Sequence, residues 1–143
     1  MGRSSGCERY PFCAYFPDEL SRRAQKLMLD YALGRISLCG PRLLVLELIN
    51  ACLVAARRRR ISEEILFKTA KEISSLQIIW VDIEKEVKKV FSLSHKYQIT
   101  AYDAAYIVAA QLKGCKFFTA DERLYNAVKH DLNFVRLLCE YPQ

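Results

Sequence analysis

Residues 100–121 have the sequence TAYDAAYIVAAQLKGCKFFTAD, and this stretch decides the fold. Thr100 is a favourable helix N-cap and Gly114 is favourable just past a helix end, so we predict a helix between them. This helix is apolar on nearly every face and rich in alanine, which predicts close packing inside a layered fold. The apolar segment after Gly114 predicts a short buried strand that ends at Asp121.

Two aspartates flank this helix–strand unit, and each has a structural and a functional interpretation. Asp103 lies in the first turn of the predicted helix, and Asp121 lies at the end of the predicted strand. An acid at the C-terminal end of a strand lies where α/β folds place their active sites. Each aspartate could instead be a helix cap, because Thr100-x-x-Asp103 has the form of an acidic capping box and Asp121 precedes a helix predicted over residues 122–129. The pair alone does not decide the function.

Composition bounds the class of protein. The 143 residues predict one domain with a substantial core, and 52% hydrophobic residues exclude a disordered chain. No apolar run approaches the ~20 residues that cross a bilayer, and no signal-peptide pattern is present, so we expect a cytoplasmic protein without a membrane partner. The net charge of +6 favours an anionic partner without identifying one. The six cysteines are scattered without a CxxC pair, which predicts buried small side chains and argues against a zinc site.

The segment LLVLELINACLV, residues 43–54, predicts a buried helix that is interrupted by one acid. Glu47 is that acid, and Asn50 follows it one turn later on the same face. An unpaired carboxylate in an apolar helix costs several kcal/mol of desolvation. We therefore expect a buried partner, an opening to a polar cleft or a metal ion beside Glu47.

The rest of the chain alternates helices with short strands. Further helices are predicted over residues 17–33, 62–76 and 82–97, and strands over residues 36–39, 77–81 and 132–138. In the helix over 82–97, we expect Val87, Val90, Phe91 and Leu93 to face inward. The run 57–60, four arginines, suits a helix C-terminus and could also contact RNA phosphates. The alternation predicts a helix-rich, three-layer α/β/α fold with a small parallel sheet.

In such a fold Glu47, Asp103 and Asp121 can converge at one edge of the sheet. Three carboxylates that point at one spot repel each other unless a divalent cation neutralises them. Ligation by oxygen alone selects Mg²⁺ or Mn²⁺ over zinc. Acids that hold such a cation in a basic protein suit phosphodiester cleavage, in which the metal activates the attacking water.

Three sequence motifs together resemble the PIN-domain family, and specifically its VapC-type ribonuclease toxins. They are Pro41 followed by Glu47 and Asn50, the segment ITAYDA at residues 99–104, and FTAD at residues 118–121. The helix start PDEL at residues 17–20 also matches, so the resemblance runs from there to the C-terminus.

This resemblance implies a site and a function. It makes Glu47, Asp103 and Asp121 the catalytic, metal-binding acids, with Thr119 and Asn50 in support. It further implies RNA cleavage with Mg²⁺ or Mn²⁺, a homodimer, and inhibition by a small antitoxin protein whose tail enters the active-site groove.

The N-terminus departs from the family, which begins with a hydrophobic strand that ends in an aspartate, the first metal ligand. Residues 1–6, MGRSSG, are a poor strand, and no aspartate precedes Asp18. Cys7 stands near the expected ligand position, and Glu8 is the only nearby oxygen substitute. We therefore predict an atypical segment over residues 1–16, a PIN-like domain over 17–143, and a first strand and first ligand that are missing or replaced.

Two other classes of protein compete with an active ribonuclease. A catalytically impaired PIN fold would act by binding RNA or an antitoxin-like partner. An unrelated Mg²⁺-binding α/β module, such as a phosphoacceptor domain, would require an acid pair after the first strand and a lysine after a late strand. The sequence has neither arrangement.

Overall fold

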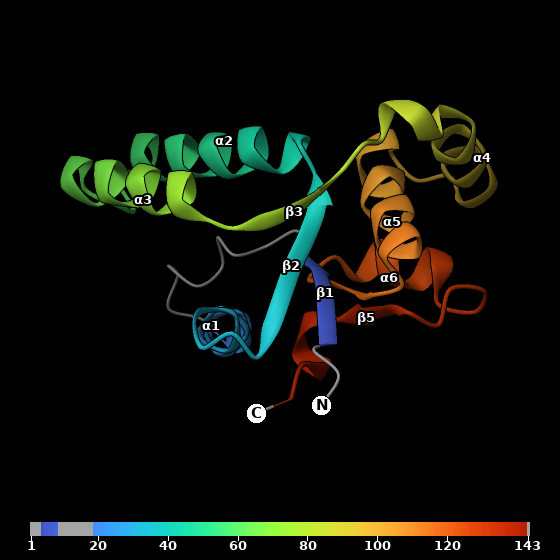
Figure 1. Cartoon of the computed structure of the whole chain (residues 1–143). Coiled ribbons are helices and arrows are strands. Elements are labelled where there is room, and N and C mark those ends of the chain that lie inside the picture. Colours follow the sequence, from blue (N-terminus) through green and yellow to red (C-terminus); the bar gives the residue numbers. More distant parts are fainter. Residues whose placement is uncertain (1–3, 9–18, 143) are drawn as a thin grey trace.

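A parallel five-stranded sheet forms the centre of the molecule (Figure 1). The computed structural model describes residues 4–8 and 19–142, and it describes side-chain surroundings from Arg22 onward. The strands are β1 (Ser4–Glu8), β2 (Ile36–Pro41), β3 (Ile78–Val81), β4 (Lys116–Thr119) and β5 (Val135–Leu137). They lie in the order β3-β2-β1-β4-β5, and every neighbouring pair is parallel. The predicted small parallel sheet is confirmed.

Helices cover both faces of this sheet. They are α1 (Glu19–Ala32), α2 (Leu43–Arg57), α3 (Glu63–Ser75), α4 (Val87–Tyr97), α5 (Ala101–Lys113) and α6 (Glu122–Val128), with short 3-10 turns at Glu84–Glu86 (η2) and Leu138–Glu140 (η3). Among the described residues, none of the helices is both long and apolar enough to cross a bilayer.

Two hydrophobic cores lie on opposite faces of the sheet. Leu38 and Phe118 pack into the core that α1 covers, whereas their chain neighbours Cys39 and Phe117 pack into the core with α2, α5 and α6. Successive side chains of a strand point to opposite faces, so adjacent residues of one strand serve different cores. This arrangement confirms the predicted three-layer α/β/α architecture.

The first strand corrects a prediction. Residues 1–6 were expected to be a poor strand and the first strand to be missing or replaced, yet Ser4–Glu8 forms β1 in the middle of the sheet. Its backbone pairs with β2 on one side and β4 on the other, with Cys7 beside both Cys39 and Phe117. Two neighbours that both need hydrogen-bond partners outweigh a weak intrinsic strand propensity. The predicted boundary between residues 16 and 17 lies outside the described residues.

The helix and strand of residues 100–121 form as predicted. The Thr100 hydroxyl oxygen accepts a hydrogen bond from the Asp103 backbone N–H at 3.1 Å and so caps α5. Gly114 ends the helix at φ +61°, a conformation that favours glycine. Every residue over 103–110 is buried, as the apolar pattern predicted.

The prediction for α4 is wrong for two side chains. Val87 and Phe91 were expected to face inward, but they are 50% and 73% exposed. They lie one turn apart and therefore share a face of the helix. Leu93 packs against the core, so α4 buries a different stripe than the sequence pattern alone suggested.

Three of the cysteines behave as small hydrophobic residues. Cys39, Cys52 and Cys115 are buried, as predicted, whereas Cys139 is exposed. The sulfurs of Cys39 and Cys115 lie 3.2 Å apart, and burial raises the pKa of the Cys52 thiol. The side chains of Cys7 and Cys13 lie outside the described ones.

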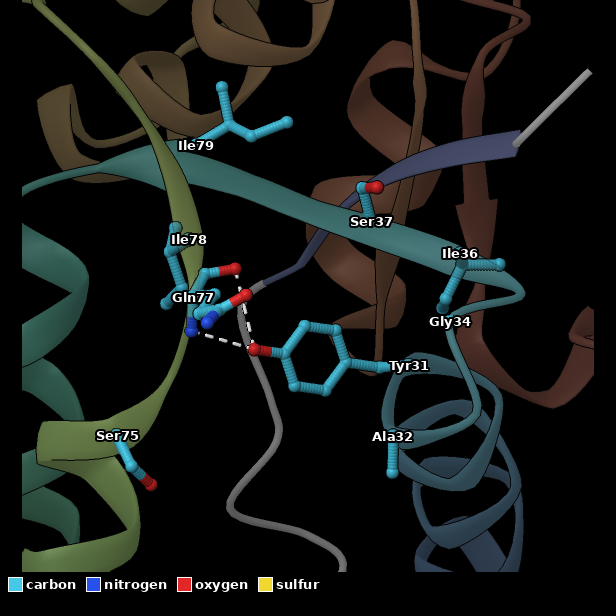
Figure 2. A pocket seen from close by; sticks show the side chains of 9 residues that line it. All are labelled: Tyr31, Ala32, Gly34, Ile36, Ser37, Ser75, Gln77, Ile78 and Ile79. Atoms are coloured by element: carbon cyan, nitrogen blue, oxygen red, sulfur yellow. Dashed lines mark hydrogen bonds between the residues drawn. The ribbon is translucent and has the colours of Figure 1, made fainter.

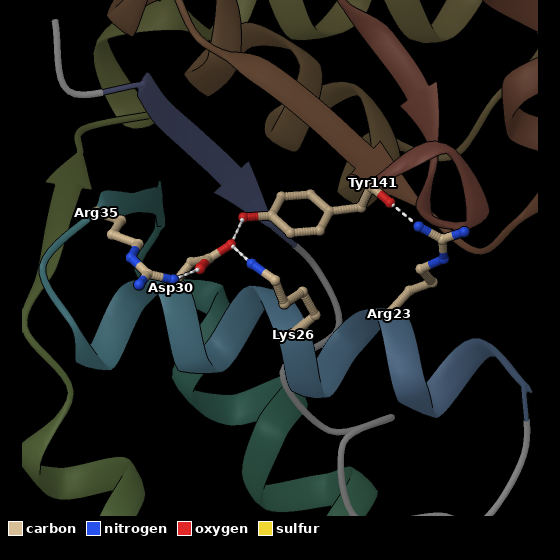
Figure 3. A network of polar contacts seen from close by, with 5 residues as sticks. All are labelled: Arg23, Lys26, Asp30, Arg35 and Tyr141. Atoms are coloured by element: carbon tan, nitrogen blue, oxygen red, sulfur yellow. Dashed lines mark hydrogen bonds and ion pairs between the residues drawn. The ribbon is translucent and has the colours of Figure 1, made fainter. Parts of the chain in front are cut away.

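A polar network ties the C-terminus to α1 (Figure 3). Asp30, 7% exposed, accepts hydrogen bonds from Lys26 at 2.6 Å, Tyr141 at 2.8 Å and Arg35 at 3.0 Å. Arg23 donates to the Tyr141 carbonyl oxygen, and the Tyr141 ring meets Phe118 edge-on at 5.2 Å. The bonds from Lys26 and Tyr141 lower the pKa of Asp30 from its ordinary 3.8 to about 2.

This lowered pKa predicts a specific loss of stability in acid. The folded state favours the carboxylate, so its contribution is fully present above pH 3.8 and is lost as the pH falls toward 2. We expect Asp30→Asn to lower Tm at neutral pH by several degrees and to flatten the dependence of Tm on pH between about 4 and 2. Melting curves across this pH range provide the measurement. The exposed Asp82→Asn is the control, and an equal change in both variants would contradict the role of the network.

Tyr31 connects α1 to Gln77, the residue that precedes β3 (Figure 2). Its hydroxyl oxygen accepts a hydrogen bond from the Gln77 N–H at 2.7 Å and donates to the Gln77 carbonyl at 3.3 Å. The ring forms one wall of a cavity of about 550 Å³, with Ile36 and Ile78 among the other lining residues. This contact fixes the distance between α1 and β3.

Candidate active site

The candidate acids surround the C-terminal edge of the parallel sheet. β2 ends at Pro41 and leads into α2, which carries Glu47, while β4 ends at Thr119, two residues before Asp121. Asp103 lies in the first turn of α5, which packs against β1, β2 and β4. Because all strands run parallel, the ends of β2, β1 and β4 lie at one edge, where α/β folds bind their ligands.

Glu47 has a buried hydrogen-bond donor. Its carboxylate accepts a short hydrogen bond from the hydroxyl of Tyr106 in α5. Tyr106 is fully buried, and its ring stacks on Phe117 with centroids 5.9 Å apart. A buried phenol needs an acceptor, and a carboxylate in an apolar helix needs a donor, so each satisfies the other. A buried partner was one of the three expected forms of compensation for Glu47.

Asp103 is buried in the first turn of α5, one turn before Tyr106. Its side chain is 8% exposed, and its Oδ1 oxygen is buried. Tyr106 follows Asp103 by three residues, so the two share a face of α5. The positive end of the helix dipole favours a carboxylate in this first turn. Tyr106 is thus connected to both acids, to Asp103 through the shared face of α5 and to Glu47 through its hydroxyl, although α2 and α5 are far apart in the sequence.

Asp121 is a helix cap, as its structural interpretation predicted. Its Oδ1 oxygen accepts hydrogen bonds from the backbone N–H groups of Arg123 at 2.9 Å and Leu124 at 3.1 Å, at the start of α6. Its own N–H donates to the hydroxyl of Thr119, which is fully buried at the end of β4. These bonds hold Asp121 at the sheet edge and leave Oδ2 outside the cap.

Asn50 and Glu8 complete the set of residues raised by the sequence. Asn50 is exposed on α2, whereas Glu47 one turn earlier is half-buried. Glu8 is the last residue of β1, and its backbone lies in register with Phe118 of β4. The central strand therefore ends in an acid at the same edge of the sheet as the ends of β2 and β4.

The donors at this edge suit a hard divalent cation by their chemistry, because carboxylate oxygens are the ligands that Mg²⁺ and Mn²⁺ prefer. Among the side chains that the structure describes, however, no three histidine, cysteine, aspartate or glutamate residues are grouped closely enough to hold a metal ion. Glu47 is engaged with Tyr106 and Asp121 with the cap of α6. Convergence of Glu47, Asp103 and Asp121 on one metal ion stays a prediction.

Tyr106 is the residue of this site that sequence reasoning missed. It stands in a helix of alanine, isoleucine and valine. A phenol hydroxyl in such a helix requires a polar partner, and the unexplained buried acid at Glu47 requires a donor. A hydroxyl that requires an acceptor and a carboxylate that requires a donor together predict a hydrogen bond between Tyr106 and Glu47.

Comparison with known proteins places this fold in one family. The PIN domain family model matches residues 12–129. A similar solved structure is that of PAE2754 from Pyrobaculum aerophilum, with a TM-score of 0.58 and 19% sequence identity over 89% of this chain and 87% of that one. No curated protein matches the chain. At this identity the structural likeness shows the fold alone. The family model spans most of the chain, and the protein therefore belongs to the PIN-domain family.

Proposed function

We propose that this protein is a metal-dependent endoribonuclease, the toxin of a VapBC-type pair, that hydrolyses RNA phosphodiesters in the cytoplasm. PIN domains are generally metal-dependent nucleases. The observation that carries the proposal is the hydrogen bond from Tyr106 to Glu47, which ties the acid of α2 to the helix whose first turn carries Asp103. The net charge of +6 favours a polyanionic substrate.

In this mechanism Glu47, Asp103 and Asp121 would hold Mg²⁺ or Mn²⁺ through carboxylate oxygens. When bound, the cation would activate a water and stabilise charge on the phosphate. Tyr106 orients Glu47 through its hydroxyl, and the cap of α6 fixes the backbone of Asp121 through Oδ1. The Thr119 hydroxyl holds the turn between β4 and Asp121. Glu47 and Asp103 lie on α2 and α5, so each of the three acids is held by a regular element or by a bonded turn.

RNA cleavage by the purified full chain tests this proposal. We expect fluorescently labelled single-stranded RNA to be cut with Mg²⁺ or Mn²⁺ and to remain intact with EDTA. Cleavage that persists in EDTA would indicate a contaminating metal-independent ribonuclease or a different mechanism, and absence of cleavage with both metals would contradict the proposal.

A catalytically impaired PIN fold that binds RNA or an antitoxin is the second candidate. It is favoured by the lack of a group of three metal-ligating side chains within the described part of the chain. The two candidate functions make different predictions for Glu8, which ends β1 at the C-terminal edge of the sheet. An active nuclease needs an acidic ligand there, whereas an impaired fold does not.

We expect Glu8→Gln to lower Mg²⁺ affinity and cleavage at least tenfold if Glu8 supplies the first acidic ligand, because the amide carries no charge. Isothermal titration with Mg²⁺ and the cleavage assay give the measurement, and Glu8→Asp, which keeps the charge, is the control. If Glu8→Gln binds Mg²⁺ as the parent does, Glu8 is no ligand. If the parent itself neither binds Mg²⁺ nor cuts RNA, the impaired fold is the correct description.

The expected protein partners are a second copy of this chain and a small antitoxin. Exposed apolar side chains support both. Leu46, Ile49 and Leu53 form an exposed stripe on α2, which we assign to the antitoxin because the stripe follows the helix that carries Glu47. Val87 and Phe91 on α4 are assigned to the homodimer.

We expect Phe91→Glu to convert the dimer to a monomer, because it buries a charge where the partner's apolar surface would lie. Light scattering combined with size exclusion measures the mass. Ser92→Glu, which places the same charge on a neighbouring exposed position of α4, should remain a dimer. A parent chain that is already monomeric at micromolar concentration would contradict this assignment.

A further inference from the structure

A cavity of about 480 Å³ lies at the C-terminal ends of β2 and β3. In the register of these strands, Trp80 lies beside Gly40 and Val81 beside Pro41, so the residues that follow both strands form the walls. Arg42 and Leu43 line it from the start of α2, and Asp82 and Glu84 line it from the segment after β3. Its volume falls in the range of small-ligand sites.

An aromatic ring and a guanidinium group dominate one wall of this cavity. Trp80 is half-buried, packed against the core, and the exposed Arg42 guanidinium lies 5.7 Å from its ring centroid. Proteins bind single-stranded nucleic acid by stacking bases on aromatic rings while cations contact the phosphates. Because Arg42 is exposed, its side chain can rotate away from the Trp80 ring when a base stacks there. The guanidinium can then contact a phosphate.

Carboxylates define the other side of the cavity. Asp82 accepts a hydrogen bond from the Glu84 N–H at 3.1 Å and pairs with Lys85 at 3.6 Å, while the Glu84 side chain is exposed. Two carboxylates outnumber the single Lys85 ammonium here, so the net negative charge of this wall disfavours a phosphate and favours the base end of a nucleotide. A carboxylate accepts hydrogen bonds from ring and exocyclic N–H groups, and guanine presents two such donors side by side on its Watson–Crick edge.

The cavity lies at the start of α2, the helix that carries Glu47. Leu43 lines the cavity, and Glu47 follows it by four residues, one turn along the same face of α2. A single strand whose scissile phosphate lies at the acids could therefore place a neighbouring base beside Trp80.

We propose that this cavity is a nucleobase subsite that stacks an unpaired base of single-stranded RNA on Trp80 and prefers guanine through Asp82 and Glu84. The inference rests on the proposed function, because it assumes that RNA is the substrate. It adds the residues that choose the base next to the cleaved bond.

The chain itself supplies the probe, because Trp80 is its one tryptophan. We expect short uridine oligonucleotides that contain a single guanine to quench Trp80 fluorescence saturably in EDTA, where no cleavage occurs. All-uridine oligonucleotides of the same length should quench more weakly. Binding by fluorescence anisotropy of labelled RNA gives the affinity for variants that lack the tryptophan.

Four variants separate the contributions of the lining residues. Trp80→Leu should weaken RNA binding by about 5- to 100-fold with an unchanged salt slope, whereas Trp80→Phe should retain most of the affinity. Arg42→Ala should reduce the logarithmic salt slope by about 0.7, the value of one single-strand phosphate contact. Asp82→Asn should reduce the preference for guanine. Arg136→Ala, on the exposed face of β5 at the opposite side of the sheet, is the matched control and should change none of these.

The outcomes distinguish this subsite from the nuclease proposal. Saturable quenching in EDTA by a chain that never cuts RNA with Mg²⁺ supports the subsite and removes the nuclease. Metal-dependent cleavage that is unaffected by Trp80→Leu and by Arg42→Ala supports the nuclease and overturns the subsite. RNA that binds without quenching Trp80, or an equal effect of Arg42→Ala and Arg136→Ala, also overturns it.

Discussion

Replacing Asp103 by asparagine is expected to abolish metal-dependent RNA cleavage, by more than about 100-fold, while leaving the fold nearly as stable as the parent. The amide keeps the size of the side chain but removes the charge that a divalent cation requires. Loss of even an outer-shell partner of a metal ligand costs about 10–100-fold, so loss of a ligand should cost more. Cleavage assays with Mg²⁺ and melting curves with and without Mg²⁺ are the measurements.

The melting curves of Asp103→Asn distinguish a role of Asp103 as a metal ligand from a role in capping α5. The Thr100 hydroxyl bonds the backbone N–H of Asp103, which the substitution keeps. Relief of repulsion among neighbouring acids offsets the lost attraction to the helix dipole, which is about 0.3–1 kcal/mol. A variant that cuts RNA normally would contradict the ligand role, and one that melts far below the parent would make Asp103 a structural residue. Glu122→Gln, an exposed acid in the first turn of α6, is the control and should keep both activity and stability.

Replacing Tyr106 by alanine is expected to cost about 3–5 kcal/mol of unfolding free energy. The fully buried ring stacks on Phe117, and its hydroxyl donates to Glu47, so truncation leaves a cavity and a half-buried carboxylate without this donor. Denaturant titration of the parent and the variant measures the loss. A cost below about 1 kcal/mol would contradict the described packing of α5.

Tyr106→Phe isolates the hydroxyl from the ring. It keeps the stack on Phe117 and removes the bond to Glu47, so we expect a smaller loss of about 1–3 kcal/mol. A double-mutant cycle with Glu47→Gln should show a coupling energy of at least about 0.5 kcal/mol. Additive effects of the two substitutions would mean that the bond contributes nothing to stability. A loss of cleavage in Tyr106→Phe beyond the loss of folded protein would identify Tyr106 as a positioning residue for Glu47.

Local patterns predicted the helix–strand unit of residues 100–121 correctly. Thr100 and Gly114 act through bonds and backbone angles that involve only a few neighbouring residues, so the sequence suffices to place them. The cap at Asp121 is local in the same way. Amphipathic pattern alone was insufficient for Phe91, because helical spacing indicates two possible apolar stripes and only the position of α5 selects the buried one.

The acids were identified from the sequence, but their surroundings come from tertiary contacts. The bond between Tyr106 and Glu47 joins residues 59 positions apart, and no local pattern encodes which buried acid meets which phenol. Trp80 and Arg42 meet for a similar reason, because β2 and β3 pair across the intervening helices α2 and α3.

The sequence by itself determined the helix-rich parallel α/β class, the capped and glycine-terminated α5, and the positions of Asp103 in the first turn of α5 and of Asp121 before α6. These features depend on periodicity and on contacts within a turn. Only the tertiary structure decided that Ser4–Glu8 is the central strand. Its residues are poor strand formers, and they are held there by the backbone hydrogen bonds of β2 and β4, which come from segments about 30 and 110 residues further along the chain.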